Sequence, residues 1–176
     1  MNLLVPDSWL REYLKTKATP TQIKEYLSLC GPSVERIDKI GKETIYEIEV
    51  TSNRPDSMSI VGIAREAAAI LPHFGIAADL LNDPYKSKSK IQNLKSKVEK
   101  KLKITTDPKL NPRFMAVVIT NVKVGPSPAW LRQKLEMTGI RSLNNVIDIT
   151  NYLMRALGQP AHAFDYDEIK PKNGIP

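Results

Sequence analysis

The polar side chains that could form a site lie close together in the sequence, between residues 141 and 165. Arg141, Asn151 and His162 stand out, and His162 sits between two alanines just past a Gly-Gln-Pro turn. Guanidinium, amide and imidazole groups hold anions, substrate hydroxyls and water through hydrogen bonds. Each residue also has an ordinary explanation: a cation favoured after a helix end, an amide on a solvated helix face, and a turn histidine. The residues alone leave both interpretations open.

Two predicted helices position this cluster. Pro126-Ser127-Pro128 is expected to start a helix over 129–139 that Gly139 ends, and a second helix covers 145–158. The core face of the second helix is predicted to carry Val146, Ile149, Leu153 and Leu157. Another face carries Asp148, Asn151 and Arg155. Upstream, the runs at 98–106 and 113–124 predict two strands, the second long and well buried.

The start of the chain predicts a compact unit with two short helices and a strand. The first helix, 8–14, has Asp7 or Ser8 as a candidate cap, and its apolar face consists of Trp9, Leu10, Tyr13 and Leu14. The second helix, 21–29, is opened by Thr19-Pro20-Thr21 and ended by Gly31-Pro32. Residues 44–50 alternate between apolar and polar positions, as a strand does.

A strand-to-helix corner follows at Asn53, Arg54 and Asp56, and we interpret it as structural. Pro55 favours an extended Arg54, and Asp56 or Ser57 is expected to cap the next helix. That helix ends before Pro72, and its apolar stripe consists of Ile60, Ile63, Ala64, Ala67 and Leu71.

The composition changes between Asn82 and Lys97, where the chain becomes polar and rich in lysine. We therefore expect an amino-terminal domain at 1–82, a linker at 83–97 and a second domain at 98–176. Helices and strands follow one another in mixed order and no repeat occurs, so the predicted fold class is α+β.

The net charge of +7 is confined to one segment. Residues 86–103 hold eight lysines and one acidic residue, which leaves 18 basic and 18 acidic residues elsewhere. Such a block is usually a solvated linker. The alternative is an arm that attracts phosphate, with Lys95, Lys97, Lys100, Lys101 and Lys103 as candidate nucleic-acid contacts. No aromatic residue interrupts the block, so it offers no platform for stacking bases.

Several classes of protein are disfavoured by what the sequence lacks. The single cysteine, Cys30, allows no intramolecular disulfide and no cysteine zinc cluster. There is no phosphate-binding loop or dinucleotide fingerprint, and no nucleophile stands in a recognisable frame. The first residues resemble neither a signal peptide nor a spanning helix, so a cytoplasmic protein without a membrane partner is expected.

Three stretches, taken in order, resemble the β subunit of bacterial-type phenylalanine–tRNA ligase. The three stretches are NRPDSMSIVGIAREAAAI, VKVGPSPAWLRQKLEMTGIRSLNNVIDITNYLM and LGQPAHAFDYDEI. Near the start of the chain, DSWLREYL and GPSVERI also resemble that subunit. The resemblance implies an α+β amino-terminal domain followed by the first part of a mixed α/β editing domain.

The chain departs from the family pattern in two ways. An oligonucleotide-binding barrel usually follows the first two helices, but here residues 33–50 pass directly into NRPD, which leaves no room for it. The family's subunit also runs to several hundred residues, so we interpret the chain as an amino-terminal fragment. The lysine block at 86–103 could partly replace the missing tRNA contact.

The resemblance implies a role in removing mischarged tyrosine. Arg141 resembles an arginine at the entrance of the family's editing pocket, Asn151 a polar residue lining it, and His162 the pocket histidine, which could orient water or the ester. The family's glutamate that recognises the tyrosine hydroxyl would lie beyond Pro176. No metal or cofactor is expected in this segment, because ATP and Mg²⁺ belong to the α subunit of an α2β2 heterotetramer that acts on tRNA(Phe).

Two other functions stay open at this point. One is a free-standing deacylase of mischarged tRNA that shares the editing fold. The other is a non-catalytic nucleic-acid-binding module that uses the lysine block, for which binding would depend steeply on salt and would not need His162.

Overall fold

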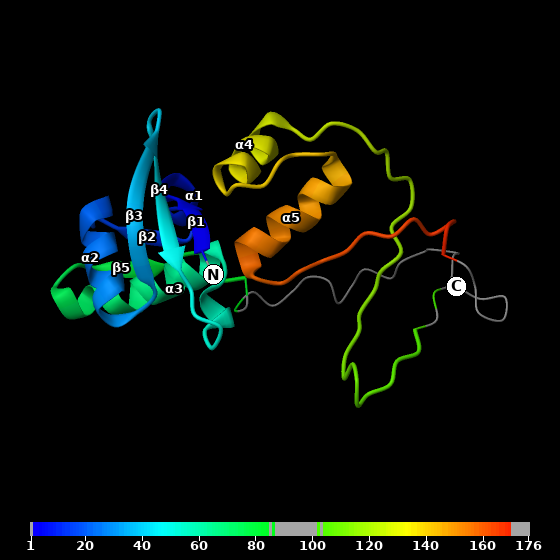
Figure 1. Ribbon diagram of the computed structural model, residues 1–176, viewed down its shortest axis with the longest axis horizontal. Helices are drawn as coiled ribbons and strands as arrows, with labels where there is room; N and C mark the ends of the chain where they lie inside the picture. Colours follow the sequence, from blue (N-terminus) through cyan, green and yellow to red (C-terminus); the bar gives the residue numbers. More distant parts are fainter. Residues whose placement is uncertain (1, 85, 87–101, 103, 170–176) are drawn as a thin grey trace. The chain divides into compact units, whose positions relative to one another are not determined.

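The computed structural model describes residues 2–84, 86, 102 and 104–169 and confirms the α+β class (Figure 1). The chain divides into two compact units. The first comprises Met1–Lys88 and Gly125–His162, and the second comprises Ser89–Val124 and Ala163–Pro176. All the helices and strands of the described residues belong to the first unit. No helix in the described part of the chain is both long and apolar enough to cross a membrane.

A three-stranded antiparallel sheet forms the base of the first unit. Its order is β1 (Asn2–Pro6), β4 (Glu43–Glu49) and β3 (Ser33–Ile40). The strand predicted at 44–50 is therefore confirmed. Leu3 pairs with Ile48 and Val5 with Tyr46, and all four side chains are buried. The alternation of the sequence thus places one face of the sheet in the core.

The hairpin between β3 and β4 explains why no barrel fits there. Ile40 pairs with Glu43, so only Gly41 and Lys42 make the turn. Gly41 has φ +61°, a conformation that glycine adopts without steric cost. The chain passes from one strand to the next in two residues, which agrees with the expectation that residues 33–50 leave no room for a barrel.

The first helix is shorter than predicted. It covers α1 (Asp7–Leu10), and the chain then enters β2 (Leu14–Thr16), which pairs with β5 (Ala78–Leu80). Pairing with a distant strand outweighs the local preference of residues 11–14 for a helix. The cap prediction is also wrong, because Asp7 does not cap the helix but binds Arg11 at 3.1 Å and the Tyr46 hydroxyl at 2.6 Å.

The second helix, α2 (Pro20–Cys30), confirms the prediction. Thr19 and Gln22 form a capping box, in which each side chain accepts a hydrogen bond from the backbone N–H of the other residue. Gly31 follows the last residue, and a side chain there would press on Ile70, 2.9 Å from the position of a Cβ atom.

The third helix, α3 (Ile60–Ile70), buries the predicted stripe of Ile60, Ile63, Ala64, Ala67 and Leu71. Its cap is Ser59, which accepts a hydrogen bond from the Gly62 N–H, and not Asp56 or Ser57. Those two residues lie in a preceding 3₁₀ turn, η1 (Pro55–Ser57). A second 3₁₀ turn, η2 (Leu71–Phe74), follows α3 and contains Pro72.

Helices α4 (Ala129–Met137) and α5 (Asn145–Leu157) begin where predicted and end two residues and one residue earlier. The predicted core face of α5 is only partly correct: Leu157 packs against the core cluster. Ile149 and Leu153 are exposed, whereas Asp148 and Ala156 are buried. Ala156 belongs to the core cluster of the first unit, and Tyr152 packs against it. Which face of this helix is buried therefore depends on the elements that pack against it and not only on the hydrophobicity of its residues.

In the second unit, the strand predicted at 113–124 is also wrong. The segment has no regular secondary structure, and its apolar side chains are exposed at Phe114, Met115, Val117, Ile119, Val122 and Val124. A strand requires a partner for its backbone hydrogen bonds. Of the strand predicted at 98–106, residues 98–101 and 103 lie outside the described residues.

Candidate functional site

The three predicted site residues all belong to α5 or to the segments that flank it. Arg141 is exposed in the loop between α4 and α5, Asn151 is half-buried near the middle of α5, and His162 is exposed five residues past its end. Thirteen helical residues span about 20 Å, so the helix alone does not bring Arg141 and His162 together. The chain reverses direction after Gly158, a left-handed C-cap with φ +77° (Figure 1).

A buried carboxylate organises the amino-terminal end of this helix. Asp148 is fully buried, and its Oδ2 atom accepts hydrogen bonds from the hydroxyls of Ser127 and Ser142, each at 2.5 Å. Its Oδ1 atom accepts the Leu143 N–H at 2.9 Å. Because Ser142 follows Arg141 directly, the carboxylate fixes the backbone next to the candidate entrance arginine. One side chain thus joins α5 to the segments on both sides of α4.

The ionisation of Asp148 depends on these three donors. Burial on its own would raise the pKa of the carboxyl, but the hydrogen bonds from Ser127, Ser142 and Leu143 outweigh it and lower the pKa below its usual value. The sequence analysis assigned Asp148 only to a second helix face and missed this role. The local signal was an acidic residue in the first turn of a predicted helix, six residues after Ser142, whereas Ser127 lies 21 residues upstream.

Two asparagines at the start of α5 make further hydrogen bonds in the same region. Asn144 caps α5, because its side chain accepts hydrogen bonds from the N–H groups of Val146 and Ile147. Asn145 exchanges hydrogen bonds with Gly125, through its side chain at 3.1 Å and its backbone at 2.8 Å. The loop that carries Arg141 is therefore held by the start of α5 at several points.

Arg155 lies one helical turn beyond Asn151 and is only partly compensated. Its guanidinium is half-buried, and its Nε atom has no hydrogen-bond partner within the described residues. Burial lowers the pKa of Arg155. Residues four apart lie on the same side of a helix, so this cation stands next to the candidate pocket residue.

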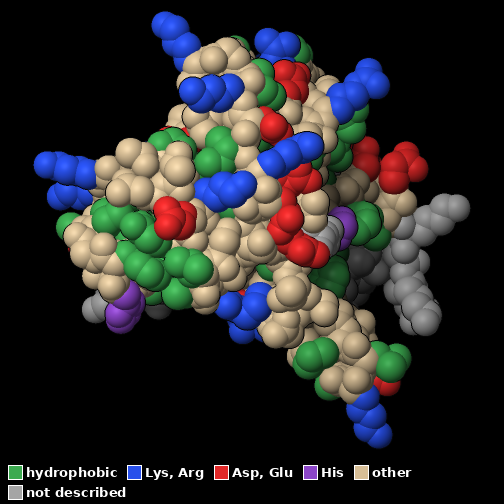
Figure 2. All heavy atoms as spheres, turned by 60° about the vertical axis from the view of Figure 1, so that its left-hand side comes forward, with side chains coloured by type: hydrophobic (Ala, Val, Ile, Leu, Met, Phe, Trp, Pro, Cys, Tyr) green, Lys and Arg blue, Asp and Glu red, His purple; other side chains and the backbone are tan. Residues whose placement is uncertain are grey.

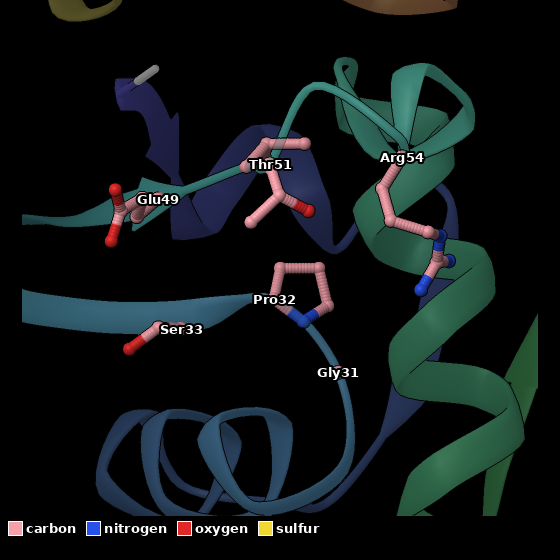
Figure 3. Close-up of a pocket in the computed structure, with 7 residues that line it drawn as sticks. Gly31, Pro32, Ser33, Glu49, Thr51 and Arg54 are labelled. Carbon is pink, nitrogen blue, oxygen red and sulfur yellow. The ribbon is translucent and has the colours of Figure 1, made fainter.

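The small hollow shown in Figure 3 is not part of this cluster. It has a volume of about 170 Å³ and is lined by Gly31, Pro32, Ser33, Glu49, Val50, Thr51 and Arg54. Arg54 forms ion pairs with Asp56 at 2.8 Å and with Glu66 at 2.6 Å. The hydrogen bond to Asp56, together with Glu66, raises the pKa of Arg54, and the same bond lowers that of Asp56. This corner ties η1 to α3, in line with the structural interpretation.

Basic side chains do not gather into a patch on the face shown in Figure 2, where lysine and arginine are interspersed with aspartate and glutamate. Of the candidate nucleic-acid contacts, Lys95, Lys97, Lys100, Lys101 and Lys103 lie outside the described residues. Within the residues that the structure describes, histidine, cysteine, aspartate and glutamate form no group of three or more that could hold a metal ion.

Comparison with known proteins defines the class of the region that contains the candidate site. Residues 110–175 match the B3/4 domain, and this range includes α4, α5 and all three candidate residues.

Longer similarities extend this assignment to most of the chain. It is 36% identical over 173 residues to the phenylalanine–tRNA ligase β subunit of Rhodopirellula baltica, which covers 95% of this chain. It is 42% identical over 135 residues to the β subunit of Geobacter sulfurreducens and 46% over 125 residues to that of Clostridium tetani, which cover 76% and 71% of this chain. The chain belongs to the phenylalanine–tRNA ligase β-subunit family.

The matched regions account for only a small part of these relatives. They span 23% of the Rhodopirellula subunit, 16% of the Geobacter subunit and 15% of the Clostridium subunit. Membership of the family is therefore shown for a segment, and the activity, substrates and partners of a whole ligase are proposals for this chain.

Proposed function

We propose that this chain is part of a phenylalanine–tRNA ligase β subunit and contributes Arg141, Asn151 and His162 to a site that hydrolyses tyrosyl-tRNA(Phe). The observation that carries the proposal is the B3/4 match over residues 110–175, which contains all three side chains. The division into an amino-terminal domain at 1–82, a linker at 83–97 and an editing segment at 98–176 belongs to the same proposal.

The chemistry of discrimination explains why such a site is needed. Phenylalanine and tyrosine differ by one hydroxyl, and an apolar pocket rejects the larger amino acid by a factor of only about 100. A second site that hydrogen-bonds the tyrosine hydroxyl works in the opposite sense, because phenylalanine would leave its buried polar groups unpaired. Hydrolysis there removes the wrong product after it has formed.

The proposed roles come from the family resemblance, and the burial and exposure of the side chains agree with them. Arg141 is exposed on a loop that Asp148 holds, so it is available to the phosphates at the end of the tRNA. Asn151 is half-buried and would line the pocket, with the Arg155 cation beside it. His162 would orient the attacking water or the ester by a hydrogen bond. In the proposed enzyme, an α subunit holds ATP and Mg²⁺ for the synthetic reaction in an α2β2 assembly.

The test is the hydrolysis of tyrosyl-tRNA(Phe) by the native β subunit assembled with its α subunit. We expect His162→Ala to lower the rate at least tenfold, which corresponds to about 1.4 kcal/mol of barrier. His73→Ala is the matched control, because His73 is the other histidine and is exposed in η2. Equal rates for wild type and His162→Ala would remove His162 from the site. A wild type that hydrolyses nothing would refute the editing proposal.

A second candidate function is tRNA binding through the lysine block, favoured by the confinement of the whole charge excess to residues 86–103. Replacing Lys95, Lys97, Lys100, Lys101 and Lys103 by glutamine would then weaken tRNA binding and flatten its dependence on salt concentration. Replacing Lys39 and Lys42, which are exposed on the β3–β4 hairpin, is the control. Unchanged binding after the glutamine substitutions would refute this function.

A further inference from the structure

A charged and aromatic contact joins the α4–α5 hairpin to the amino-terminal helices of the same compact unit. The Nζ atom of Lys134, on α4, lies 2.7 Å from both carboxylate oxygens of Glu12. The same atom lies 5.1 Å from the ring centroid of Trp9, 5.8 Å from that of Tyr152 and 6.0 Å from that of Trp130. One ammonium group is thus surrounded by three rings and a carboxylate.

The rings also contact each other. Trp9 is fully buried, and its ring stacks on Tyr152 with centroids 5.0 Å apart and an interplanar angle of 15°. Trp130 meets Tyr152 edge-on at 5.7 Å. Offset stacking and edge-to-face contacts are the favoured geometries of aromatic pairs, and a cation within about 6 Å of a ring centroid is attracted to its face. The cluster therefore connects α1, α4 and α5 through both shape and charge.

The cluster lies directly beside the candidate site residues in the chain. Tyr152 follows Asn151, so the ring that stacks on Trp9 fixes the rotation of α5 about its own axis at the level of Asn151. Lys134 sits near the end of α4, seven residues before Arg141, and Leu131 and Leu135 of the same helix are buried. A shift of α4 would therefore move the loop that carries Arg141.

We propose that Lys134 is a positioning residue for the candidate editing site, which it serves by locking the α4–α5 hairpin onto Glu12 and Trp9. The inference rests on the proposed function, since the reaction it refers to is the hydrolysis of tyrosyl-tRNA(Phe). Its proposed role is not to touch substrate but to hold α5, which carries Asn151, and α4, which leads into the loop that carries Arg141. Misplacing reacting groups by about 1 Å lowers a rate on the order of a hundredfold, so a loosened hairpin has a measurable effect.

The experiment uses the native β subunit assembled with its α subunit and a charge-swap design. Lys134→Glu and Glu12→Lys each place two like charges at the contact, and the double variant restores an opposite pair with the charges exchanged. Lys134→Arg keeps the cation. Lys42→Glu, in the exposed β3–β4 turn, makes the same charge change away from the contact and is the control.

We expect each single variant to lower kcat for deacylation by about tenfold with KM changed less than twofold, because the hairpin positions the reacting groups. The double variant restores the ion pair but places a carboxylate beside the ring faces, so it should recover only part of the loss. Lys134→Arg and Lys42→Glu should stay close to wild type. Rates are expressed per folded enzyme, so a loss of folded protein alone does not imitate the effect. Unchanged kcat in Lys134→Glu, or a double variant no better than the singles, would overturn the proposal.

Amide hydrogen exchange over residues 139–151 separates this inference from the proposed function. The single variants should exchange faster there than wild type, and the double variant should return toward it. If wild type deacylates but exchange is the same in all variants, the positioning role is refuted while the editing function stands. If wild type does not deacylate and exchange still follows the charge pairing, the editing function fails and the lock between the helices remains.

Discussion

The buried carboxylate of Asp148 gives the sharpest prediction for stability. It accepts three hydrogen bonds, from Ser127 and Ser142 at 2.5 Å and from the Leu143 N–H at 2.9 Å. In Asp148→Asn, an amide oxygen can still accept from Leu143, but an NH₂ group replaces the oxygen that both hydroxyls address. The hydroxyls can reverse and accept, so two charge-assisted bonds become two neutral ones.

Each of these changes costs about 1 kcal/mol, so we expect Asp148→Asn to lower the free energy of unfolding by about 2 kcal/mol at pH 7. Asp148→Ala leaves the buried donors without an acceptor, and we expect about 4 kcal/mol. Urea unfolding measures both values. Asp38→Asn is the control, because Asp38 is half-exposed in an ion pair with Arg36 and its loss should cost less than about 1 kcal/mol.

The pH dependence tests whether the charge is what the hydroxyls bind. The pKa of Asp148 is lowered in the folded protein, so its stabilisation is complete above the unfolded value of about 4 and is lost as the pH falls through the folded value. The difference between wild type and Asp148→Asn should therefore shrink between pH 7 and pH 3. A difference that stays constant, or an Asp148→Asn variant as stable as Asp38→Asn, would refute the reasoning.

Three further predictions concern single positions and are also checked by urea unfolding. Gly62→Ala should destabilise by about 3 kcal/mol, since its Cβ atom would lie 2.2 Å from the backbone oxygen of Asp56, and an equally stable variant would contradict this packing. Thr19→Ala removes the capping box of α2 and should cost about 1 kcal/mol, whereas Thr44→Ala, at a half-buried position in β4 that caps no helix, should cost less. Arg155→Leu should raise stability by about 1 kcal/mol, because it removes a half-buried cation with an unpaired Nε; a loss of stability would show that the guanidinium is compensated.

The elements that the sequence predicted well are those specified by neighbouring residues. The capping box at Thr19 and Gln22 and the glycine at position 31 define α2 from within thirteen residues of chain. The stripe of α3 could likewise be read from its 3.6-residue period, because that helix lies in the core of the first unit. Helix bounds and periodic stripes depend on residues close in the sequence, so they can be predicted without knowing which distant segments pack against the helix.

The predictions that failed depend on contacts between distant segments. Residues 11–14 have a helical pattern, but Leu14 pairs with Leu80 in a short sheet. The run at 113–124 has the alternation of a strand, yet its backbone groups have no strand partner in the described part of the chain. Asp148 could not be identified as a buried acceptor, because its donors Ser127 and Ser142 come from other parts of the chain and become neighbours only when the helices pack.

In helix α5, the side chains that pack against the rest of the protein and the candidate site residue lie on different flanks. A helix turns about 100° per residue, so Asp148, Tyr152 and Ala156 follow one flank, which faces the core and the Trp9 ring. Ile149 and Leu153 follow a second flank, which is exposed. Asn151 is about 200° from either of these two and shares a third flank with Arg155.

This separation accounts for the wrong core face and also favours the candidate site. The apolar flank resembled a core face because apolar residues are usually buried, but Tyr152, Ala156 and Leu157 make the contacts with the core cluster. Asp148 instead binds Ser127, Ser142 and Leu143 beside α4. Asn151 consequently lies outside both the covered flank and the apolar one. Asn151 is half-buried there beside the half-buried Arg155 guanidinium, and the proposed editing role requires this flank to receive a polar, negatively charged substrate such as the end of a tRNA.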